Sequence, residues 1–426
     1  MRKLKLFVNK TTEQPVNTGL ITLAKIRDEL VGRLGSGDTG ATQAVDIAIR
    51  QAVLHRASDL HFEPWNDCLS LRYRIDGILH EVARIPKAHQ ERIIARIKIL
   101  ARMVVYQKDA PQDGRIDADE IRGDKEMRVS TFPTVYGEKV VVRIFDSSRN
   151  VLALDFLGFR PEVVADLRDL IFRPQGTVLL TGPSSSGKTT TIYALLRELA
   201  ASREPAPHIV TIEDPVECRL GKVSQTQINP HAGFTFESAL RSLLRQDPEV
   251  IMVGEIRDAE TARTAIQAGL TGHLVISTIH SGTAAGVFTR LLDMGIEPFL
   301  IASSVTGVLA QRLVRVNCSR CTAEYTPEAS LLARYELDAE KTVFRRGTGC
   351  DGCQGIGYRG RTAIGELLIV NEEVADLVLA RSRTRVLHDA VVRSGMVTLV
   401  EDGVEKAGLG VTALEELRRV LPPAVS

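Results

Sequence analysis

Residues 182–189, Gly-Pro-Ser-Ser-Ser-Gly-Lys-Thr, constrain the fold most tightly, because they fit the phosphate-loop pattern G-x-x-x-x-G-K-[ST] in full. An apolar run, Thr177–Leu180, directly precedes this loop, and a helical stretch, Thr190–Leu199, follows it. A strand, a glycine loop and a helix in this order are the structural context that the motif requires. The segment therefore predicts a phosphate-binding turn in a chain of the α/β class.

The loop has the chemistry to hold a nucleoside triphosphate. Its backbone N–H groups and the N-terminus of the following helix present positive potential to phosphates. Lys188 adds a point charge at the β- and γ-phosphates, and the Thr189 hydroxyl can ligate Mg²⁺. The alternative, a Gly/Ser-rich loop with a chance lysine, is disfavoured by the flanking strand and helix. We expect ATP and Mg²⁺ at Gly182, Pro183, Ser184, Ser185, Ser186, Gly187, Lys188, Thr189 and Thr190.

Three further apolar runs, at 208–212, 250–253 and 274–277, alternate with helical stretches, which is typical of a buried, mostly parallel sheet. Two of these runs lead into the acids Glu213 and Glu255, and the strand ends of such a sheet meet at the phosphate site. We expect one carboxylate to hold Mg²⁺ through water and the other to orient or deprotonate the attacking water. The sequence leaves open which does which, and the alternative for either is a solvated turn acid.

A histidine, His280, follows the last of these runs and falls at the same sheet edge as the two acids. This position favours a role in sensing the γ-phosphate. The alternative is a structural histidine, which is the more common case for a lone histidine near a strand end.

Four of the six cysteines form two Cys-x-x-Cys pairs, Cys318 with Cys321 and Cys350 with Cys353, separated by 28 residues. The pattern predicts a closed Cys₄ zinc site, which is structural because four thiolates leave no open position for water. The alternatives are disulfides, which are rare in the cytosol, and unrelated thiols. We place this Cys-rich, Gly-rich element at about 318–360 and expect a helical tail after it.

The N-terminal part of the chain has a different pattern. Leu69, Leu71, Tyr73 and Ile75 alternate with polar residues, as in a half-buried strand, and Asp76-Gly77 is a hairpin signal. Helices are expected at 20–34, at 41–56 and around 93–101, and strands at 3–8, 126–131 and 139–145. These elements predict the following organisation: a short N-terminal segment and linker at 1–40, a small α+β domain at 41–146, a linker at 147–160, and a P-loop domain at 161–426 that includes the cysteine element.

Composition excludes several classes of protein. The 426 residues are 44% hydrophobic and 25% charged, which rules out disordered, collagen-like and coiled-coil chains. Lys and Arg total 54 against 53 Asp and Glu, and only 5% of residues are aromatic, so neither a basic surface nor base-stacking platforms for nucleic acid are expected. No window approaches 18 consecutive apolar residues, so no transmembrane helix is expected and a cytoplasmic location is predicted.

Taken together, these motifs resemble one known family, the secretion ATPases of type II secretion and type IV pilus assembly (GspE/PilB type). The similarity runs from about Ala41 to Val420. Thr211–Glu217 is similar to the family's Asp box, Gly254–Asp258 to its Walker B motif, and Thr271–His280 to its His box. The remaining matching segments are His55–Pro64, Arg72–Gly77, Pro111–Arg115, Arg128–Thr131 and Leu244–Pro248.

The resemblance implies a RecA-like motor domain behind a smaller PAS-like domain, assembled as a homo-hexamer. It also implies ATP hydrolysis that drives an inner-membrane platform protein, which extrudes a pilus or a pseudopilus. The protein would then be peripheral to the inner membrane and would touch it only through partners. The rival reading is a nucleic-acid motor or regulator that uses the Cys₄ element as a zinc ribbon. Secretion and pilus assembly are not distinguished.

The same resemblance places the small domain against a motor domain, where Arg115 and Arg128 could reach the γ-phosphate. The alternative is that these arginines form surface pairs with Asp113, Asp117, Asp124 or Glu126, which contribute only about 0–1 kcal/mol.

Three departures from the family pattern stand out. Ser185 occupies a position that is usually glycine, so that the turn is expected to be slightly strained. Cys218 stands where an aromatic residue is common. The first 40 residues are fewer than the complete N-terminal docking domain of many members requires.

Overall fold

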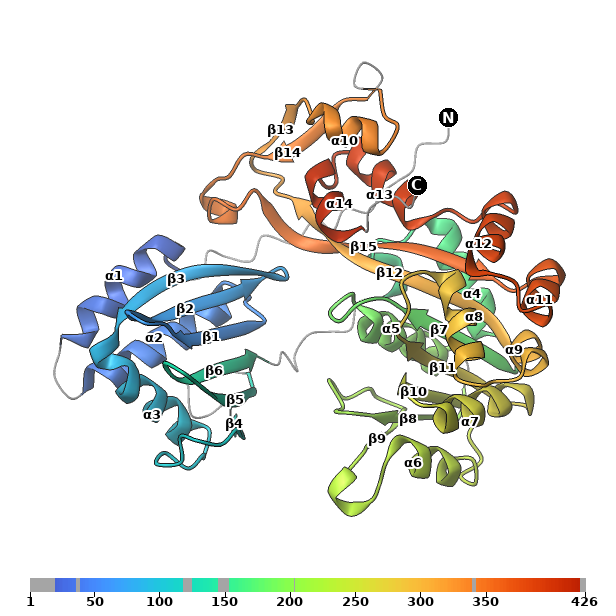
Figure 1. Ribbon diagram of the computed structural model, residues 1–426, viewed down its shortest axis with the longest axis horizontal. Helices are drawn as coiled ribbons and strands as arrows, with labels where there is room; N and C mark the ends of the chain where they lie inside the picture. The colour runs from blue at the N-terminus through green and yellow to red at the C-terminus, as the bar shows by residue number, and fades with distance from the viewer. Residues whose placement is uncertain are drawn as a thin grey trace. The chain divides into compact units, whose positions relative to one another are not determined.

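The structure is a computed structural model, which describes residues 20–35, 39–117, 125–144, 153–202, 204–338 and 342–421. Its contacts divide the chain into two compact units (Figure 1). The first comprises residues 1–150, with which the short segment Gly349–Gly355 is grouped, and the second comprises 151–348 and 356–426. Both units combine helices with a sheet, so the mixed α/β class is confirmed. The strand expected at 3–8 lies outside the described residues.

The first unit contains a six-stranded antiparallel sheet in the order β3-β2-β1-β6-β5-β4. Its strands are β1 Asp59–Pro64, β2 Cys68–Ile75, β3 Ile78–Pro86, β4 Gln112–Ile116, β5 Met127–Thr134 and β6 Gly137–Ile144. Its helices are α1 Leu23–Leu34, α2 Gly40–Leu54 and α3 Gln90–Leu100, with a 3₁₀ turn, η2, at Lys87–His89.

Local sequence explains the β2–β3 hairpin. Apolar side chains at alternating positions of β2, from Leu69 to Ile75, are buried, and Tyr73 donates a hydrogen bond of 2.6 Å to the carbonyl of Ala48. Asp76 and Gly77 have φ values of +47° and +86°, the left-handed pair that a two-residue hairpin turn needs. The hairpin predicted from the sequence is therefore confirmed.

The second unit contains a seven-stranded sheet in the order β15-β12-β7-β11-β10-β8-β9. All neighbouring strands are parallel except β12 and β15. The strands are β7 Gly176–Thr181, β8 Ile209–Glu213, β9 Ser224–Gln227, β10 Val250–Ile256, β11 Leu274–Ile279, β12 Val305–Asn317 and β15 Tyr358–Ile369, and a separate two-stranded sheet pairs β13 Thr322–Tyr325 with β14 Phe344–Gly347.

Helices cover both faces of this sheet, because its central strands are buried on both sides. Val178 and Leu180 of β7 join the core under α4 and α5, whereas Leu179 joins the core on the opposite face. The helices are α4 Pro161–Ile171, α5 Lys188–Ala201, α6 Phe236–Leu243, α7 Ala259–Leu270, α8 Ala284–Asp293, α9 Pro298–Ser304, α10 Ala329–Arg334, α11 Glu372–Leu379, α12 Thr384–Arg393, α13 Leu399–Gly408 and α14 Leu414–Val420, with 3₁₀ turns η4 Leu154–Phe156, η5 Pro230–Ala232 and η6 Asp351–Cys353. In the described part of the chain, no helix is both long and apolar enough to cross a membrane.

Two long strands of the second unit, β12 and β15, match no predicted element. They pair along most of their length and are labelled side by side in Figure 1. β12 follows α9 without a turn and is buried for most of its length, so it shows neither a boundary nor an alternation of polar and apolar residues. The expected helical tail is confirmed only from α11 onward.

A buried histidine in the first unit gives its stability a defined pH dependence. His61, on β1, is 9% exposed, and neither ring nitrogen has a hydrogen-bond partner among the described residues. Burial lowers the pKa of His61 to about 4, whereas an unfolded histidine titrates near 6.5. The unfolded chain therefore binds a proton that the folded unit does not, and stability is lost as the pH falls from 6.5 towards 4.

Between pH 6.5 and pH 4, we expect the free energy of unfolding of the first unit to fall by roughly 2 kcal/mol more in the wild type than in His61→Gln. Trp65, the only tryptophan of the chain, lies between β1 and β2, so its fluorescence in urea titrations reports on this unit. The exposed His231 provides a control variant, His231→Gln, which should keep the wild-type slope. Equal slopes in wild type and His61→Gln would remove His61 as the cause.

Candidate active site

The phosphate loop connects the end of β7 to the start of α5. Gly182 has a φ of +148°, and a side chain there would place its Cβ 2.5 Å from the carbonyl oxygen of Gln311. Gly187, at the start of α5, has a φ of +90°. Both positions thus require glycine, and together they turn the first amides of α5 towards the carboxyl edge of the sheet.

Ser185 also lies in the left-handed region, with a φ of +62°. A residue other than glycine there costs about 1–2 kcal/mol. The strain expected from a serine at this position is therefore present.

The ammonium group of Lys188 is held by its own loop. Its Nζ donates hydrogen bonds to the carbonyl oxygens of Gly182, at 2.8 Å, and Pro183, at 3.0 Å. Burial lowers the pKa of Lys188, the nearby positive charge of Arg312 lowers it further, and the carboxylate of Glu255 opposes the shift. Lys188 is therefore electrostatically coupled to both of these side chains.

Glu255 lies on β10, and its side chain is 18% exposed. One carboxylate oxygen lies 2.5 Å from the guanidinium of Arg257, and the other lies 3.7 Å from Nε2 of His280. The hydrogen bond to Glu255 raises the pKa of Arg257. His280, which follows β11, is more than half exposed. Glu255 thus combines contact with solvent and with the predicted γ-phosphate sensor.

Glu213, the last residue of β8, has a very different environment. It is 2% exposed, and its carboxylate accepts hydrogen bonds from the Tyr193 hydroxyl, from Oγ1 of Thr211 at 2.5 Å and from Nε2 of Gln225 at 3.1 Å. Burial, together with this carboxylate, raises the pKa of Tyr193. Because Tyr193 lies on α5, Glu213 ties the helix of the phosphate loop to β8.

The sheet order explains why these residues meet. β7, β11, β10 and β8 are consecutive parallel strands, so the phosphate loop, His280, Glu255 and Glu213 share one edge. Gly254 stands beside Glu213. A Cβ on Gly254 would lie 3.2 Å from the carbonyl oxygen of Ile212, so glycine at this position allows the two strand ends to approach.

Two polar residues of β12, Gln311 and Arg312, belong to the same site but were not identified from the sequence. The Gln311 side-chain amide donates to the carbonyl of Ser186 at 2.8 Å, and Arg312 donates to the carbonyl of Gly282 at 2.9 Å. Both residues interrupt an otherwise apolar run from Val308 to Val314, and this interruption is the sequence signal by which they could have been identified.

The predicted arginines Arg115 and Arg128 lie in the first unit, where they stand directly opposite each other on β4 and β5. Arg143 of β6 is opposite Arg128, so the three form a row across neighbouring strands, which we call the arginine row. Arg115 pairs with Glu126 at 3.6 Å, and Arg143 pairs with Asp59 at 3.0 Å. Glu126 is one of the acids that the surface-pair alternative named for Arg115.

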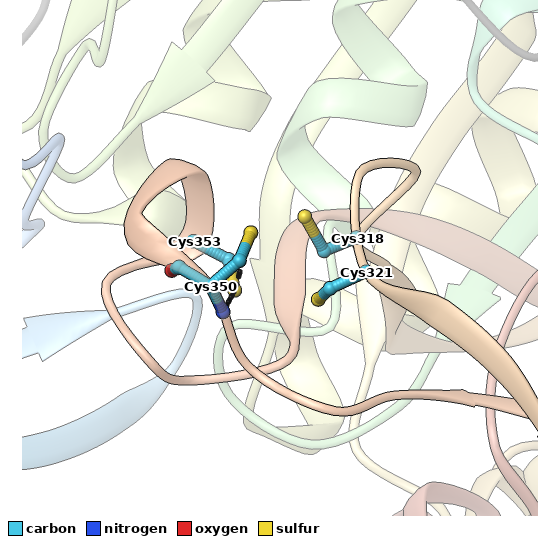
Figure 2. A group of neighbouring side chains, drawn as sticks. All are labelled: Cys318, Cys321, Cys350 and Cys353. Atoms are coloured by element: carbon cyan, nitrogen blue, oxygen red, sulfur yellow. Dashed lines mark hydrogen bonds between the residues drawn. The ribbon is translucent and has the colours of Figure 1, made fainter.

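The four paired cysteines form one group (Figure 2). Their sulfur atoms all lie within 4.8 Å of one another, and those of Cys350 and Cys353 are 3.8 Å apart. Four sulfurs around a zinc ion, each at about 2.3 Å, would be about 3.8 Å apart, so the group fits a tetrahedral metal. A Cβ on Gly347 would lie 1.8 Å from the carbonyl of Gly357, so glycine is required where the segments flanking the second pair cross.

Comparisons with known proteins agree on one family. The model of the family described as "Type II/IV secretion system protein" matches residues 36–419. A "Type IV pilus assembly ATPase PilB" from Thermus thermophilus is 43% identical over 92% of this chain and 44% of its own length. A "Type II secretion system ATPase E" from Vibrio cholerae is 43% identical over 90% of this chain and 76% of its own length.

Solved structures show the same fold at lower identity. The crystal structure of the pilus retraction motor PilT with bound ADP matches this chain with a TM-score of 0.60 at 24% sequence identity, and the match covers 89% of this chain and 97% of the PilT chain. The ATPase DotB of Legionella pneumophila has a TM-score of 0.64 and 20% identity, and covers 88% of this chain and 94% of its own.

Proposed function

The chain belongs to the family of type II/IV secretion system proteins and is an ATPase, and from this premise we propose that it is a hexameric motor whose ATP hydrolysis powers assembly of a pilus or a secretion pseudopilus. The proposal includes a RecA-like motor domain, a PAS-like domain before it, and a cytoplasmic location at the inner membrane, where a platform protein is the partner. The observation that carries it is the convergence of Lys188, Glu255 and His280 at one sheet edge beside the phosphate loop.

The residues of this edge divide the work of hydrolysis between them. Lys188 neutralises the β- and γ-phosphates of ATP, and Thr189 supplies a hydroxyl ligand for Mg²⁺, which adds charge neutralisation when bound. Glu255 is the better candidate for orienting and deprotonating the attacking water, because it is in contact with solvent. The carboxylate of Glu213 already accepts three hydrogen bonds from protein donors, which fits a structural role that links α5, β8 and β9 at the site.

A genetic test addresses the function as a whole. The gene for this chain is deleted in its host, and the wild type or Lys188→Ala is restored on a plasmid. We expect the wild type, and not the variant, to restore either surface pili or secretion of exoproteins. Restoration by the variant of whichever phenotype the deletion abolishes would contradict the proposal. ATP turnover that rises on addition of DNA would favour the nucleic-acid motor instead.

The arginine row suggests that the small domain acts on ATP bound by a neighbouring subunit. We expect Arg115→Ala or Arg128→Ala to lower kcat at least tenfold with little change in nucleotide affinity, since arginines that neutralise transition-state charge contribute roughly 10³–10⁵ to turnover. Arg84→Ala, which removes an exposed pair with Glu81 in the same unit, is the matched control.

Mixing an arginine variant with inactive Lys188→Ala should restore some activity if the arginine acts across a subunit boundary. Near-normal rates in both Arg115→Ala and Arg128→Ala would leave only the surface-pair explanation.

The cysteine group is proposed to hold structural zinc through Cys318, Cys321, Cys350 and Cys353. We expect Cys350→Ser to lose the metal and unfold the element locally, because structural zinc supplies roughly 10–16 kcal/mol of apparent binding energy. ATP binding should survive, since the phosphate loop belongs to a different part of the core. Metal analysis and nucleotide titration measure the two effects, and Cys218→Ser is the control. Wild-type protein without zinc would exclude the assignment.

A further inference from the structure

Arg312 is a buried cation beside the phosphate loop. It is 7% exposed, and its guanidinium donates 2.9 Å hydrogen bonds to two backbone carbonyls, those of Gln311 and Gly282. Within the described ranges, no carboxylate lies within 4.0 Å of it, and Glu366 acts on it only at longer range. A buried charge without a close counterion is costly, so this arginine is expected to meet an anion during the working cycle.

The position of Arg312 beside the phosphate loop points to phosphate as that anion. Its Nη1 is 3.1 Å from the point where a Cβ on Gly182 would stand, so the guanidinium lies against the first glycine of the loop. Lys188 Nζ donates to the carbonyl of the same glycine at 2.8 Å, so the two cations lie close to one residue and repel each other. A polyphosphate bound by the loop would relieve this repulsion, and a polyphosphate with more negative charge would relieve it more.

Arg312 also fixes the segment that follows His280. It holds the carbonyl of Gly282, while the carboxylate of Glu366 accepts the amide of Ala284 at 2.8 Å and the Thr181 hydroxyl accepts the amide of Ser281 at 2.8 Å. The neighbouring Gln311 holds the carbonyl of Ser186 in the phosphate loop. Adjacent residues of one strand therefore fasten both the phosphate loop and the loop that follows His280.

We propose that Arg312 is a positioning residue for ATP hydrolysis. Its guanidinium adds positive charge to the phosphate site and holds the loop after His280 in place beside the phosphate loop. This inference rests on the proposed function, since it assigns a residue to the same site. Both parts of the role suit arginine, whose planar group can hold two carbonyls at once while staying charged.

Two substitutions separate the charge from the geometry. Arg312→Lys keeps the charge but loses the planar fork, so ATP affinity should stay within threefold while kcat falls at least tenfold. Arg312→Gln removes the charge, so ATP affinity should fall at least tenfold. ADP carries less negative charge, so its affinity should fall less, and the preference for ATP over ADP should drop at least threefold. Calorimetric titration and steady-state kinetics give these quantities.

Arg315→Gln is the matched control, because Arg315 lies on the same strand but pairs with Glu416, at 2.8 Å. It should lower the melting temperature and leave the preference for ATP over ADP unchanged. The proposal is overturned if Arg312→Gln keeps both this preference and kcat within twofold of the wild type, or if it behaves like Arg315→Gln. A wild-type chain that binds ATP without hydrolysing it would instead refute the proposed function, and the binding comparison would still decide the role of the charge.

Discussion

Replacing Lys188 with alanine is expected to reduce ATP turnover at least about 100-fold, because the change removes the charge that neutralises the β- and γ-phosphates. The fold should persist. The Nζ of Lys188 contacts only two carbonyls of its own loop, so the variant removes no contact within the sheet or its helices. Phosphate release measures the rate, and thermal unfolding measures the stability.

Lys222→Ala is the matched control, since Lys222 is an exposed lysine of the same unit that pairs with Glu204. It should retain wild-type turnover. A Lys188→Ala variant with more than a tenth of the wild-type rate would show that the phosphate loop is not the site of hydrolysis.

The second large effect concerns the two acids that the sequence could not tell apart. Glu255→Gln should lower kcat at least about 100-fold and still bind ATP, because only the charge that activates water is lost. Glu213→Gln should also slow turnover, but it should destabilise the second unit as well. Its three donors lose a charged acceptor, and a buried group left unsatisfied costs about 1–3 kcal/mol.

Kinetics and denaturation of the two variants, measured side by side, distinguish the roles. The reverse pattern, with Glu213→Gln stable and inactive and Glu255→Gln active, would transfer the water-activating role to Glu213. Full activity in either variant would remove that carboxylate from the mechanism.

Much of the site follows from local sequence. The apolar runs that became β7, β8, β10 and β11 are short and bounded by turns, so their positions along the chain and the acids that end two of them could be read directly. The cysteine spacing likewise predicted that four thiols meet, which the structure confirms, whereas zinc itself stays a prediction.

Other features depend on contacts that no local pattern encodes. Glu213 is buried because Tyr193 and Gln225, from α5 and β9, surround it, and neither residue is near it in the chain. The arginine row arises from the pairing of β4, β5 and β6, which aligns Arg115, Arg128 and Arg143. Arg312 was missed because its strand is paired on both sides, by β15 and β7, and carries no alternating pattern.

The long pairing of β12 with β15 has a mechanical consequence. The register is continuous from Gly307 to Arg315 and breaks only between Arg315 and Asn317, directly before Cys318. Cys318 lies six positions after Arg312, a distance of about 20 Å in extended conformation. Because β12 and β15 are hydrogen-bonded along this length, we expect a tilt imposed beside the phosphate loop to be transmitted along the pair as far as the register shift beside the cysteines.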